Sequence, residues 1–257
     1  MLKPRIIPSL LIHKGGLYKT TFFGSPKYVG DPLNAVRIFN EKEVDELMVT
    51  DIDASRHSRE PNYTMIANLA KECRMPLCYG GGVKTVDQFK HIIGLGVEKV
   101  AISSGAIEHN SIISDASYKV GSQSVVGVID IKRTGFFKKP EVVVLNGTVR
   151  TGLDPVSLAK RFQDSGVGET VLNFVDRDGK MNGYDLSLID SVRKHISVPL
   201  TVLGGAGSTD HIKELILRNG IIGAAAGSLF VFKGKYKAVL INYPNQEEKK
   251  RLFQSIN

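Results

Sequence analysis

The chain has 257 residues, a length that fits either two ordinary domains or one large α/β barrel. Apolar residues make up 42% and charged residues 23%, close to the average for a globular protein, which excludes wholesale disorder, collagen and coiled coil. The 34 Lys and Arg residues outnumber the 26 Asp and Glu residues, a balance that suits nucleic acid, a membrane surface or an anionic small molecule.

The sequence also indicates which kinds of partner and ligand are not expected. No apolar run approaches the ~20 residues needed to span a bilayer, and the N-terminal MLKPRIIPSLLIHKGG lacks the cleavage site of a signal peptide. We therefore expect a cytoplasmic protein without a membrane partner. No short segment concentrates basic residues among aromatic ones, so nucleic acid is not expected either. Cys73 and Cys78 have the spacing of neither a metal pair nor a redox pair, and we expect no metal and no cofactor.

Strand-like apolar runs alternate with amphipathic helix-like stretches along the whole chain. The predicted strands lie at 5–12, 45–52, 76–80, 98–104, 124–131, 169–175, 198–203 and 221–227. The predicted helices lie at 31–42, 60–73, 85–95, 109–119, 154–165, 185–196 and 208–219. Asp31 before Pro32 is typical of a helix start, and Gly166 and Gly220 of helix ends. Eight strands that alternate with helices, without a low-complexity linker, predict one (β/α)8 TIM barrel, with an open doubly wound sheet as the alternative.

An internal repeat supports the barrel. LMVTDIDAS at 47–55 resembles VLNFVDRDG at 171–179, and YGGGVKTVDQFKHII at 79–93 resembles LGGAGSTDHIKELI at 203–216. The matched positions lie a nearly constant distance apart, 125 residues from Asp53 to Asp178 and 124 from Gly81 to Gly205. The sequence therefore predicts two half-barrels of four strands each, about 1–120 and 121–257.

Gly-rich segments follow the third and fourth predicted strands of each half. They are Gly80 to Gly82 and Ser103 to Gly105 in the first half, then Gly204, Gly205, Gly207, Gly227 and Ser228 in the second. Glycine lets backbone N–H groups approach an anion and serine adds a donor, although glycine also serves tight turns. Because the site of such barrels lies at the carboxyl ends of the strands, two equivalent segments predict two phosphate cradles and a ligand with a phosphate at each end.

Acidic residues also stand at strand ends: Asp51, Asp53, Asp130, Asp176 and Asp178. Asp130 ends the apolar run VVGVID, and we interpret it as a general acid or base, with a structural pair to Lys132 as the alternative. The matching position in the first half is Leu11, which cannot titrate. His13 and Lys19 are the available substitutes, on a glycine-rich segment, 13–30, that we expect to be a mobile loop closing over the ligand.

Charged residues near the starts of four predicted strands form a second pattern. They are Arg5, Glu46, Lys99 and Glu169, each followed by an apolar run. If they point inward, they form a ring of alternating sign at the floor of the barrel. A structural salt-bridge layer and a gate into a hollow barrel are equally good readings.

Eight segments spread over essentially the whole chain carry a resemblance to a known family. They are RIIPSLLIHKGGLYK, DPLNAVRIFNEKEVDELMVTDIDAS, GGGVKTVDQF, KVAISSGAIEH, GSQSVVGVIDIKR, GETVLNFVDRDGKMNGYD, GGAGSTDH and AAAGSLF. The chain resembles the cyclase subunit of imidazole glycerol phosphate synthase, in the histidine-biosynthesis (β/α)8 barrel family. A related sugar-isomerase barrel shares the repeat and phosphate sites, but DRDGKMNGYD and the charges at the strand starts are closer to the cyclase.

The resemblance implies a glutamine amidotransferase complex in which a partner glutaminase binds the amino-terminal face of the barrel. Ammonia passes a charged gate and the barrel core to the mouth. There it meets a bis-phosphorylated ribulosyl aminoimidazole carboxamide compound. Lyase and ring-closing steps then give imidazole glycerol phosphate and an aminoimidazole carboxamide ribotide.

Matching the motifs assigns a role to each candidate residue. The implied gate is Arg5, Glu46, Lys99 and Glu169, and the implied catalytic residues are Lys19 and Asp130. The implied phosphate- and substrate-binding residues are Asp51, Gly82, Ser103, Ser104, Asp178, Gly179, Gly205, Gly227 and Ser228.

Two positions depart from the family. Leu11 stands where the family places its first catalytic aspartate, and Ser103 where it usually has Asn. Losing one acid/base group costs ~10²–10⁴-fold in rate. One reading keeps the family reaction, with His13 or Lys19 as the substitute. In a second reading, the chain resembles paralogues found beside surface-polysaccharide enzymes. It then has little cyclase activity and conducts ammonia for the amidination of an acetamido sugar. A sugar-phosphate isomerase without a glutaminase is the third.

Overall fold

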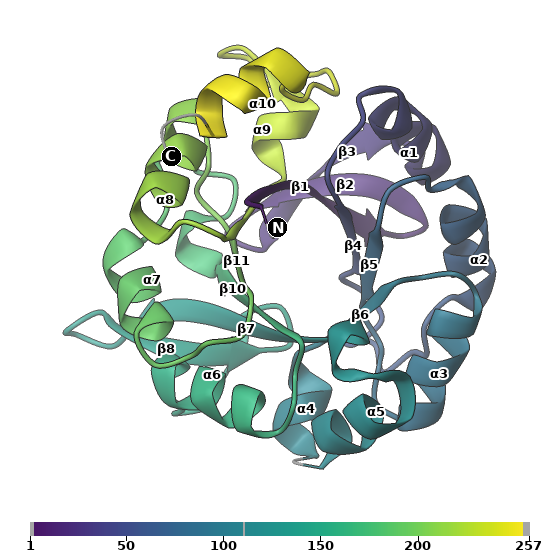
Figure 1. Cartoon of the computed structure of the whole chain (residues 1–257), viewed down its shortest axis with the longest axis vertical. Helices are drawn as coiled ribbons and strands as arrows, with labels where there is room; N and C mark the ends of the chain where they lie inside the picture. Colours follow the sequence, from purple (N-terminus) through teal and green to yellow (C-terminus); the bar gives the residue numbers. More distant parts are fainter. Residues whose placement is uncertain (1–2, 110, 254–257) are drawn as a thin grey trace.

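The structure is a computed structural model that describes residues 3–109 and 111–253. Its centre is a closed barrel of eight parallel strands (Figure 1). They are β1 (Arg5–His13), β4 (Leu47–Asp51), β5 (Leu77–Gly80), β6 (Lys99–Ile102), β7 (Val125–Thr134), β10 (Glu169–Phe174), β11 (Leu200–Leu203) and β12 (Gly223–Ala226). Pairing of β10 with β7 closes the circle. The predicted (β/α)8 TIM barrel is confirmed, and an open sheet is excluded because it would leave two barrel strands at free edges.

A ring of helices covers the outside of the barrel (Figure 1). They are α1 (Pro32–Glu41), α2 (Tyr63–Glu72), α3 (Val86–Gly94), α5 (Ile112–Val120), α6 (Pro155–Asp164), α7 (Leu186–Arg193) and α8 (Thr209–Asn219). As predicted, Asp31 caps α1, and its carboxylate accepts from the Asn34 N–H at 2.9 Å. Gly220 ends α8 with a φ of 66°, where a side chain would be strained.

The segment 13–30 is not the loop that the sequence predicts. It forms an antiparallel hairpin of β2 (Gly16–Thr21) and β3 (Gly24–Gly30), and β2 pairs with the end of β1. The rings of Tyr18 and Tyr28 pack edge to face across it at 5.3 Å. Cross-strand aromatic pairs of this kind stabilise a hairpin, a long-range effect that the glycine content concealed.

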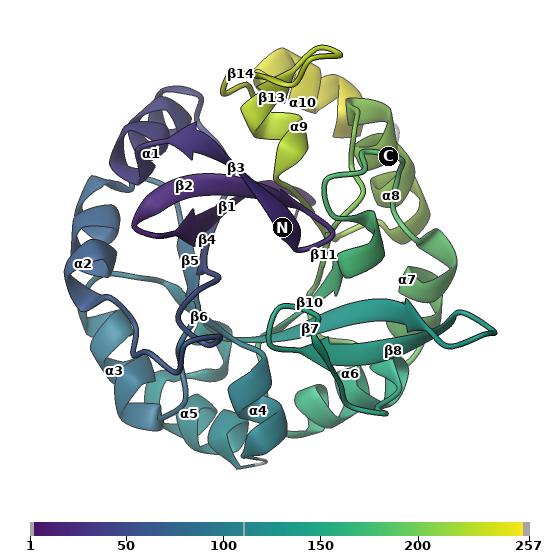
Figure 2. The same cartoon turned by 180° about the vertical axis from the view of Figure 1, so that it is seen from behind.

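Other short elements were also absent from the prediction. A second ribbon extends β7 through β8 (Lys139–Val144) and β9 (Val149–Arg150). The remaining elements are α4 (Ser104–Glu108), η1 (Ser122–Ser124), η2 (Val175–Arg177), α9 (Ser228–Val231), β13 (Phe232–Lys233), β14 (Ala238–Val239) and α10 (Gln246–Phe253). Both ribbons and the β13–β14 pair lie toward the viewer in Figure 2, around the carboxyl ends of the barrel strands.

The apolar core has two separate parts. The larger part packs between the strands and the helices. The smaller part comes from the barrel strands alone: Ile7, Met48, Cys78, Ala101, Val126, Val128, Val171 and Ala225. Alternate residues of a barrel strand face inward, so this second group fills the interior of the barrel with apolar side chains.

Four barrel strands, β1 to β6, precede residue 120 and four, β7 to β12, follow it. The division into two half-barrels near that residue stays a prediction from the repeat. Among the residues that the structure describes, no helix combines the length and the apolar character needed to cross a membrane.

Candidate functional site

A cavity opens at the carboxyl ends of the barrel strands. The implied substrate residues Asp51, Gly82, Ser103 and Ser104 line it, together with the implied catalytic residue Asp130. Its remaining lining is mainly apolar and includes Leu11, Phe23, Met48, Ile52, Val83, Val128, Leu145 and Leu203. No Lys, Arg or His lines this cavity in the described part of the chain. A concave, mainly apolar lining with a few polar groups is typical of a small-molecule site.

Asp130 stands at the centre of the cavity lining, on β7. Its carboxylate accepts from Asn173 Nδ2 at 2.8 Å and, more weakly, from Ser103 Oγ at 3.4 Å. Burial raises the pKa of Asp130 to about 6, against the opposing effect of these two hydrogen bonds. A carboxyl group poised near neutrality can donate or accept a proton, as general acid/base chemistry requires. The sequence analysis did not single out Asn173, because only the folded structure shows that its amide donates to Asp130.

Leu11 lines the same cavity, on β1. The proposed substitute His13 does not line it, and its Nδ1 lies 2.7 Å from Asp53 Oδ1. Asp53 is buried, and the hydrogen bonds from the Lys14 N–H and His13 hold its pKa below the ordinary value despite that burial. In this structure His13 is paired with Asp53, and its role as the substitute acid stays a prediction.

Lys19 is also engaged outside the cavity. Its ammonium lies 2.5 Å from Asp178 Oδ1, and both residues are buried. The other carboxylate oxygen of Asp178 accepts from Thr20 Oγ1 at 2.6 Å and from the Phe23 N–H at 3.2 Å. These bonds fasten the β2–β3 hairpin to the loop after β10. The catalytic role of Lys19 and the phosphate role of Asp178 stay predictions, and in this structure each neutralises the other.

Residues of the predicted second phosphate cradle lie beside that pair. Gly227 packs so closely on Lys19 that an added Cβ would stand 2.5 Å from the lysine Cε. Gly205 has a φ of 113° and Gly179 one of 69°, conformations that favour glycine. The Ser228 hydroxyl is buried and has no hydrogen-bond partner among the described residues. A buried donor without a partner is costly, so a bound anionic oxygen would satisfy it.

The predicted first cradle lies at the edge of the mouth cavity. Gly82 has a φ of 75°, and its N–H donates to Ser55 Oγ at 3.2 Å. Asp51 uses one carboxylate oxygen to accept from the N–H groups of Asp53 and Ala54. Ser55, which the sequence analysis did not predict, thus accepts the hydrogen bond of the Gly82 N–H, the donor that a bound phosphate would need.

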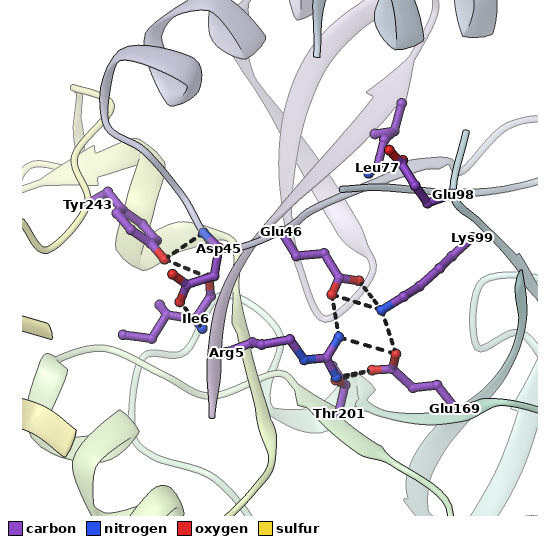
Figure 3. Close-up of polar contacts among 10 residues, drawn as sticks. All are labelled: Arg5, Ile6, Asp45, Glu46, Leu77, Glu98, Lys99, Glu169, Thr201 and Tyr243. Atoms are coloured by element: carbon purple, nitrogen blue, oxygen red, sulfur yellow. Dashed lines mark hydrogen bonds and ion pairs between the residues drawn. The ribbon is translucent and has the colours of Figure 1, made fainter. Parts of the chain in front are cut away.

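At the opposite end of the barrel, the four predicted gate residues come together (Figure 3). We call Arg5, Glu46, Lys99 and Glu169 the floor ring. Lys99 Nζ lies 2.9 Å from Glu46 and 2.8 Å from Glu169. Arg5 pairs with Glu46 through Nη1 and with Glu169 through Nη2, the latter at 2.8 Å. The positive and negative charges alternate and balance.

The electrostatics of the floor ring are set by burial and pairing. Burial alone would raise the pKa of Glu169, but Arg5 and Lys99 hold it well below its ordinary value. Burial would lower the pKa of Lys99, and the two carboxylates raise it instead. Thr201 is an unpredicted fifth contact, whose hydroxyl donates to Glu169 Oε1 at 2.5 Å. Threonine is so common in strands that no sequence signal marks it.

An open groove of about 1970 Å³ surrounds the floor ring. Cationic and apolar side chains line it together, including Lys3, Arg193, Lys249, Lys250, Leu200, Ile221, Ile222 and Phe253. This face of the barrel is therefore a concave surface with the ring at its base. Within residues 3–109 and 111–253, no three His, Cys, Asp or Glu side chains gather as metal ligands would.

Comparisons with known proteins agree over nearly the whole chain. The model of the family described as "Histidine biosynthesis protein" matches residues 5–237. A Leptospira borgpetersenii protein named "Putative imidazole glycerol phosphate synthase subunit HisF" is 56% identical over 253 residues, 98% of this chain and 100% of that protein.

Two further relatives span a wider range of identity. The Pseudomonas aeruginosa protein named "Putative imidazole glycerol phosphate synthase subunit hisF2" is 50% identical over 95% of this chain and 97% of its own length. The Alkaliphilus metalliredigens "Imidazole glycerol phosphate synthase subunit HisF" is 36% identical over 90% of this chain and 91% of its own. As its sequence resemblance predicts, the chain belongs to the histidine biosynthesis protein family.

Proposed function

We propose that this chain is the barrel subunit of an imidazole glycerol phosphate synthase-like glutamine amidotransferase complex. A partner glutaminase binds the open groove at the floor, and its ammonia crosses the barrel to an acceptor at the mouth. The observation that carries the proposal is the floor ring, which closes the amino-terminal end of an apolar barrel interior with four balanced charges. The relatives named as synthase subunits support it.

The barrel interior suits neutral ammonia. Its lining of Ile7, Ala101, Val126 and similar residues offers no partner for a charge, so ammonium would have to lose its proton to enter. Lys99 and Arg5 each bond both carboxylates, so movement of either cation would open the ring. Both cations are more exposed than the carboxylates, at 18% for Lys99 and 26% for Arg5 against 5% and 6%.

At the mouth, the contacts favour weak cyclase activity. The family reaction calls for two acid/base groups, and here Asp130 faces a cavity to which β1 contributes Leu11. His13 and Lys19 are bound to Asp53 and Asp178, outside the cavity lining. We therefore favour the second reading, in which ammonia is delivered to another acceptor, such as an acetamido sugar of surface-polysaccharide biosynthesis. The cyclase reaction of histidine biosynthesis remains the first alternative.

Turnover of the cyclase substrate tests this choice. Purified protein is given the bis-phosphorylated substrate with ammonium salt, and product formation is compared with that of a family enzyme. We expect a rate lower by at least about 100-fold, and a gain in Leu11→Asp, because the aspartate restores the missing group. Leu203→Asp is the control, since it places the same charge elsewhere in the cavity. Wild-type turnover within about tenfold of the family enzyme would restore the cyclase reading.

Coupling tests the ammonia route separately. The co-purified complex with its glutaminase is assayed for the ratio of ammonia incorporated to glutamate formed. Lys99→Ala opens the ring, and we expect this ratio to change while glutamine is still hydrolysed. Lys250→Ala removes an exposed cation of the same groove and should leave the ratio unchanged. An unchanged ratio in Lys99→Ala and in Glu169→Ala would show that the floor ring is only structural.

A further inference from the structure

Two turns on the mouth side of the barrel expose aromatic rings. The 135–139 tip joins β7 to β8, and its Phe136 and Phe137 are 94% and 80% exposed. The 233–237 tip joins β13 to β14, and its Tyr236 is 89% exposed. Neither turn lines the mouth cavity, and Lys237 Nζ of the second turn donates to the carbonyl of Gly179, beside the second predicted cradle, at 3.3 Å. Rings this exposed forgo most of the free energy that burial would supply, and their grouping on these two turns makes the turns a candidate interaction surface.

Both tips carry lysines beside the aromatic rings. Lys138, Lys139, Lys233 and Lys235 are exposed, and none forms an ion pair with a residue that the structure describes. The segments 134–139 (TGFFKK) and 232–239 (FKGKYKAV) contain no acidic residue. The two tips therefore repeat one composition, aromatic rings flanked by free cations, at places nearly a hundred residues apart in the chain.

The tips are convex and firmly supported. Residues Asp130 to Thr134 pair with Lys139 to Val143 in an antiparallel ladder, and this ribbon extends past the ring of helices (Figure 2). The rings of Phe136 and Phe137 pack edge to face at 5.4 Å. The second tip is held to the mouth by Lys27, which donates to the Lys237 carbonyl at 2.8 Å.

The projecting shape of the tips and their aromatic and lysine side chains favour one class of partner among proteins, nucleic acids and lipid bilayers. Lysine is depleted from the cores of protein interfaces, where aromatic residues and arginine are enriched. Single-stranded nucleic acid binds in grooves whose aromatic rings form stacking platforms, and these rings project from turns. An anionic bilayer needs no groove. Aromatic rings settle at the level of its headgroups and lysines against its phosphates.

We propose that the 135–139 and 233–237 tips bind the surface of an anionic lipid bilayer, with the barrel mouth on the membrane side. Phe136, Phe137 and Tyr236 enter the headgroup layer, and the neighbouring lysines contact lipid phosphates. Such binding is peripheral, reversible and sensitive to salt. It needs no spanning segment, and it departs from the sequence expectation of no membrane partner, which was based on the lack of such a segment. The proposal is independent of the reaction at the mouth.

Sedimentation with lipid vesicles tests the proposal. The full chain is mixed with phosphatidylcholine vesicles that contain or lack phosphatidylglycerol, at low and at high salt. We expect it to sediment with the anionic vesicles at low salt only. The double variant Phe136→Ser, Phe137→Ser should lower the bound fraction by about tenfold or more, because the inserted apolar area is lost. Tyr236→Ser should lower it by a smaller factor.

Tyr118→Ser supplies the matched control. Tyr118 is 94% exposed on α5, outside both tips, and its removal should leave vesicle binding unchanged. All of these side chains are exposed, so the variants should unfold as the wild type does. Failure of the wild type to sediment with anionic vesicles would overturn the proposal and leave the tips as a protein-docking surface. Equal binding by the double Phe variant, or equal loss in Tyr118→Ser, would also overturn it.

Discussion

The two ends of the barrel use their charged residues in opposite ways. At the floor, the charges of four barrel strands pair with one another inside the circle of strands, and the floor ring is self-sufficient. At the mouth, Lys19 and His13 pair with carboxylates of the surrounding loops. Asp130 is left in the cavity with two neutral hydrogen-bond donors.

Because of this difference, single residues are more readily replaced at the mouth than in the floor ring. The partners at the floor are set by the register of the barrel, so altering one member leaves unpaired charge in a buried place. At the mouth a single position of β1, Leu11, decides whether Asp130 has a titrating counterpart. A family of such barrels can therefore change its chemistry at the mouth while retaining a common floor.

Removing one carboxylate from the floor ring should have the largest effect on stability. In Glu169→Ala, Arg5 and Lys99 lose the partner that compensates their burial, and we expect the free energy of unfolding to fall by about 3–5 kcal/mol. Because pairing lowers the pKa of Glu169, this contribution is present above its ordinary value of 4.5 and is lost as the pH falls below it. Urea unfolding at neutral and acidic pH measures both effects.

Glu72→Ala is the control for an exposed pair. Its partner Arg37 is 58% exposed, so the loss should stay below about 1 kcal/mol. Equal losses in the two variants would mean that the floor ring is worth no more than a surface ion pair, and the contrast between the two ends would fail.

At the mouth, the Asp130 carboxylate should lower the stability of the protein, whereas the Glu169 carboxylate raises it at the floor. Burial raises its pKa from 3.8 to about 6, so the folded state binds a proton that the unfolded state has already lost between these values. Stability therefore falls as the pH rises through this window. Asp130→Asn removes the buried charge, and above pH 6 we expect a gain of about 3 kcal/mol in the free energy of unfolding.

The gain should disappear as the pH falls through 3.8, below which the carboxyl group becomes protonated in both states. Denaturant titrations of both proteins across this range measure the difference. Equal stabilities of wild type and Asp130→Asn at every pH would show that the carboxylate is not penalised by burial. The mouth would then resemble the floor in satisfying its charge.

The fold and the floor ring were accessible from sequence for a common reason. The barrel strands appear as apolar runs, and Arg5, Glu46, Lys99 and Glu169 stand out as charges at their starts. Parallel pairing in a closed barrel brings the starts of all strands to one end, so composition and topology together specify the ring. No detail of side-chain conformation was needed.

The partners at the mouth were not accessible in the same way. Lys19 reaches Asp178 only because the segment after β1 folds back as a hairpin, and that depends on packing between Tyr18 and Tyr28. His13 meets Asp53 through the register of β1 against β4. Sequence shows which groups are present near the mouth, but long-range register decides which of them remain free for chemistry.

The smallest expected effect is that of replacing Thr201, which tests whether its hydrogen bond adds to the stability of the floor ring. Its hydroxyl donates to Glu169, so Thr201→Val removes one hydrogen bond to a charged group with little change of shape. We expect a loss of about 1.5 kcal/mol, at the low end for such bonds because Arg5 and Lys99 still hold the carboxylate. Coupling of glutamine hydrolysis should shift in the same direction as in Glu169→Ala, by less.

Thr170→Val is the matched control from the neighbouring strand. The Thr170 hydroxyl is buried and finds no hydrogen-bond partner in the part of the chain that the structure describes. Its removal should leave stability unchanged or improve it, because a buried hydroxyl without a partner is itself unfavourable. Chemical denaturation distinguishes the two valine variants directly. If both lose the same stability, the Thr201 hydroxyl contributes nothing specific to Glu169, and the floor ring consists of its four charges alone.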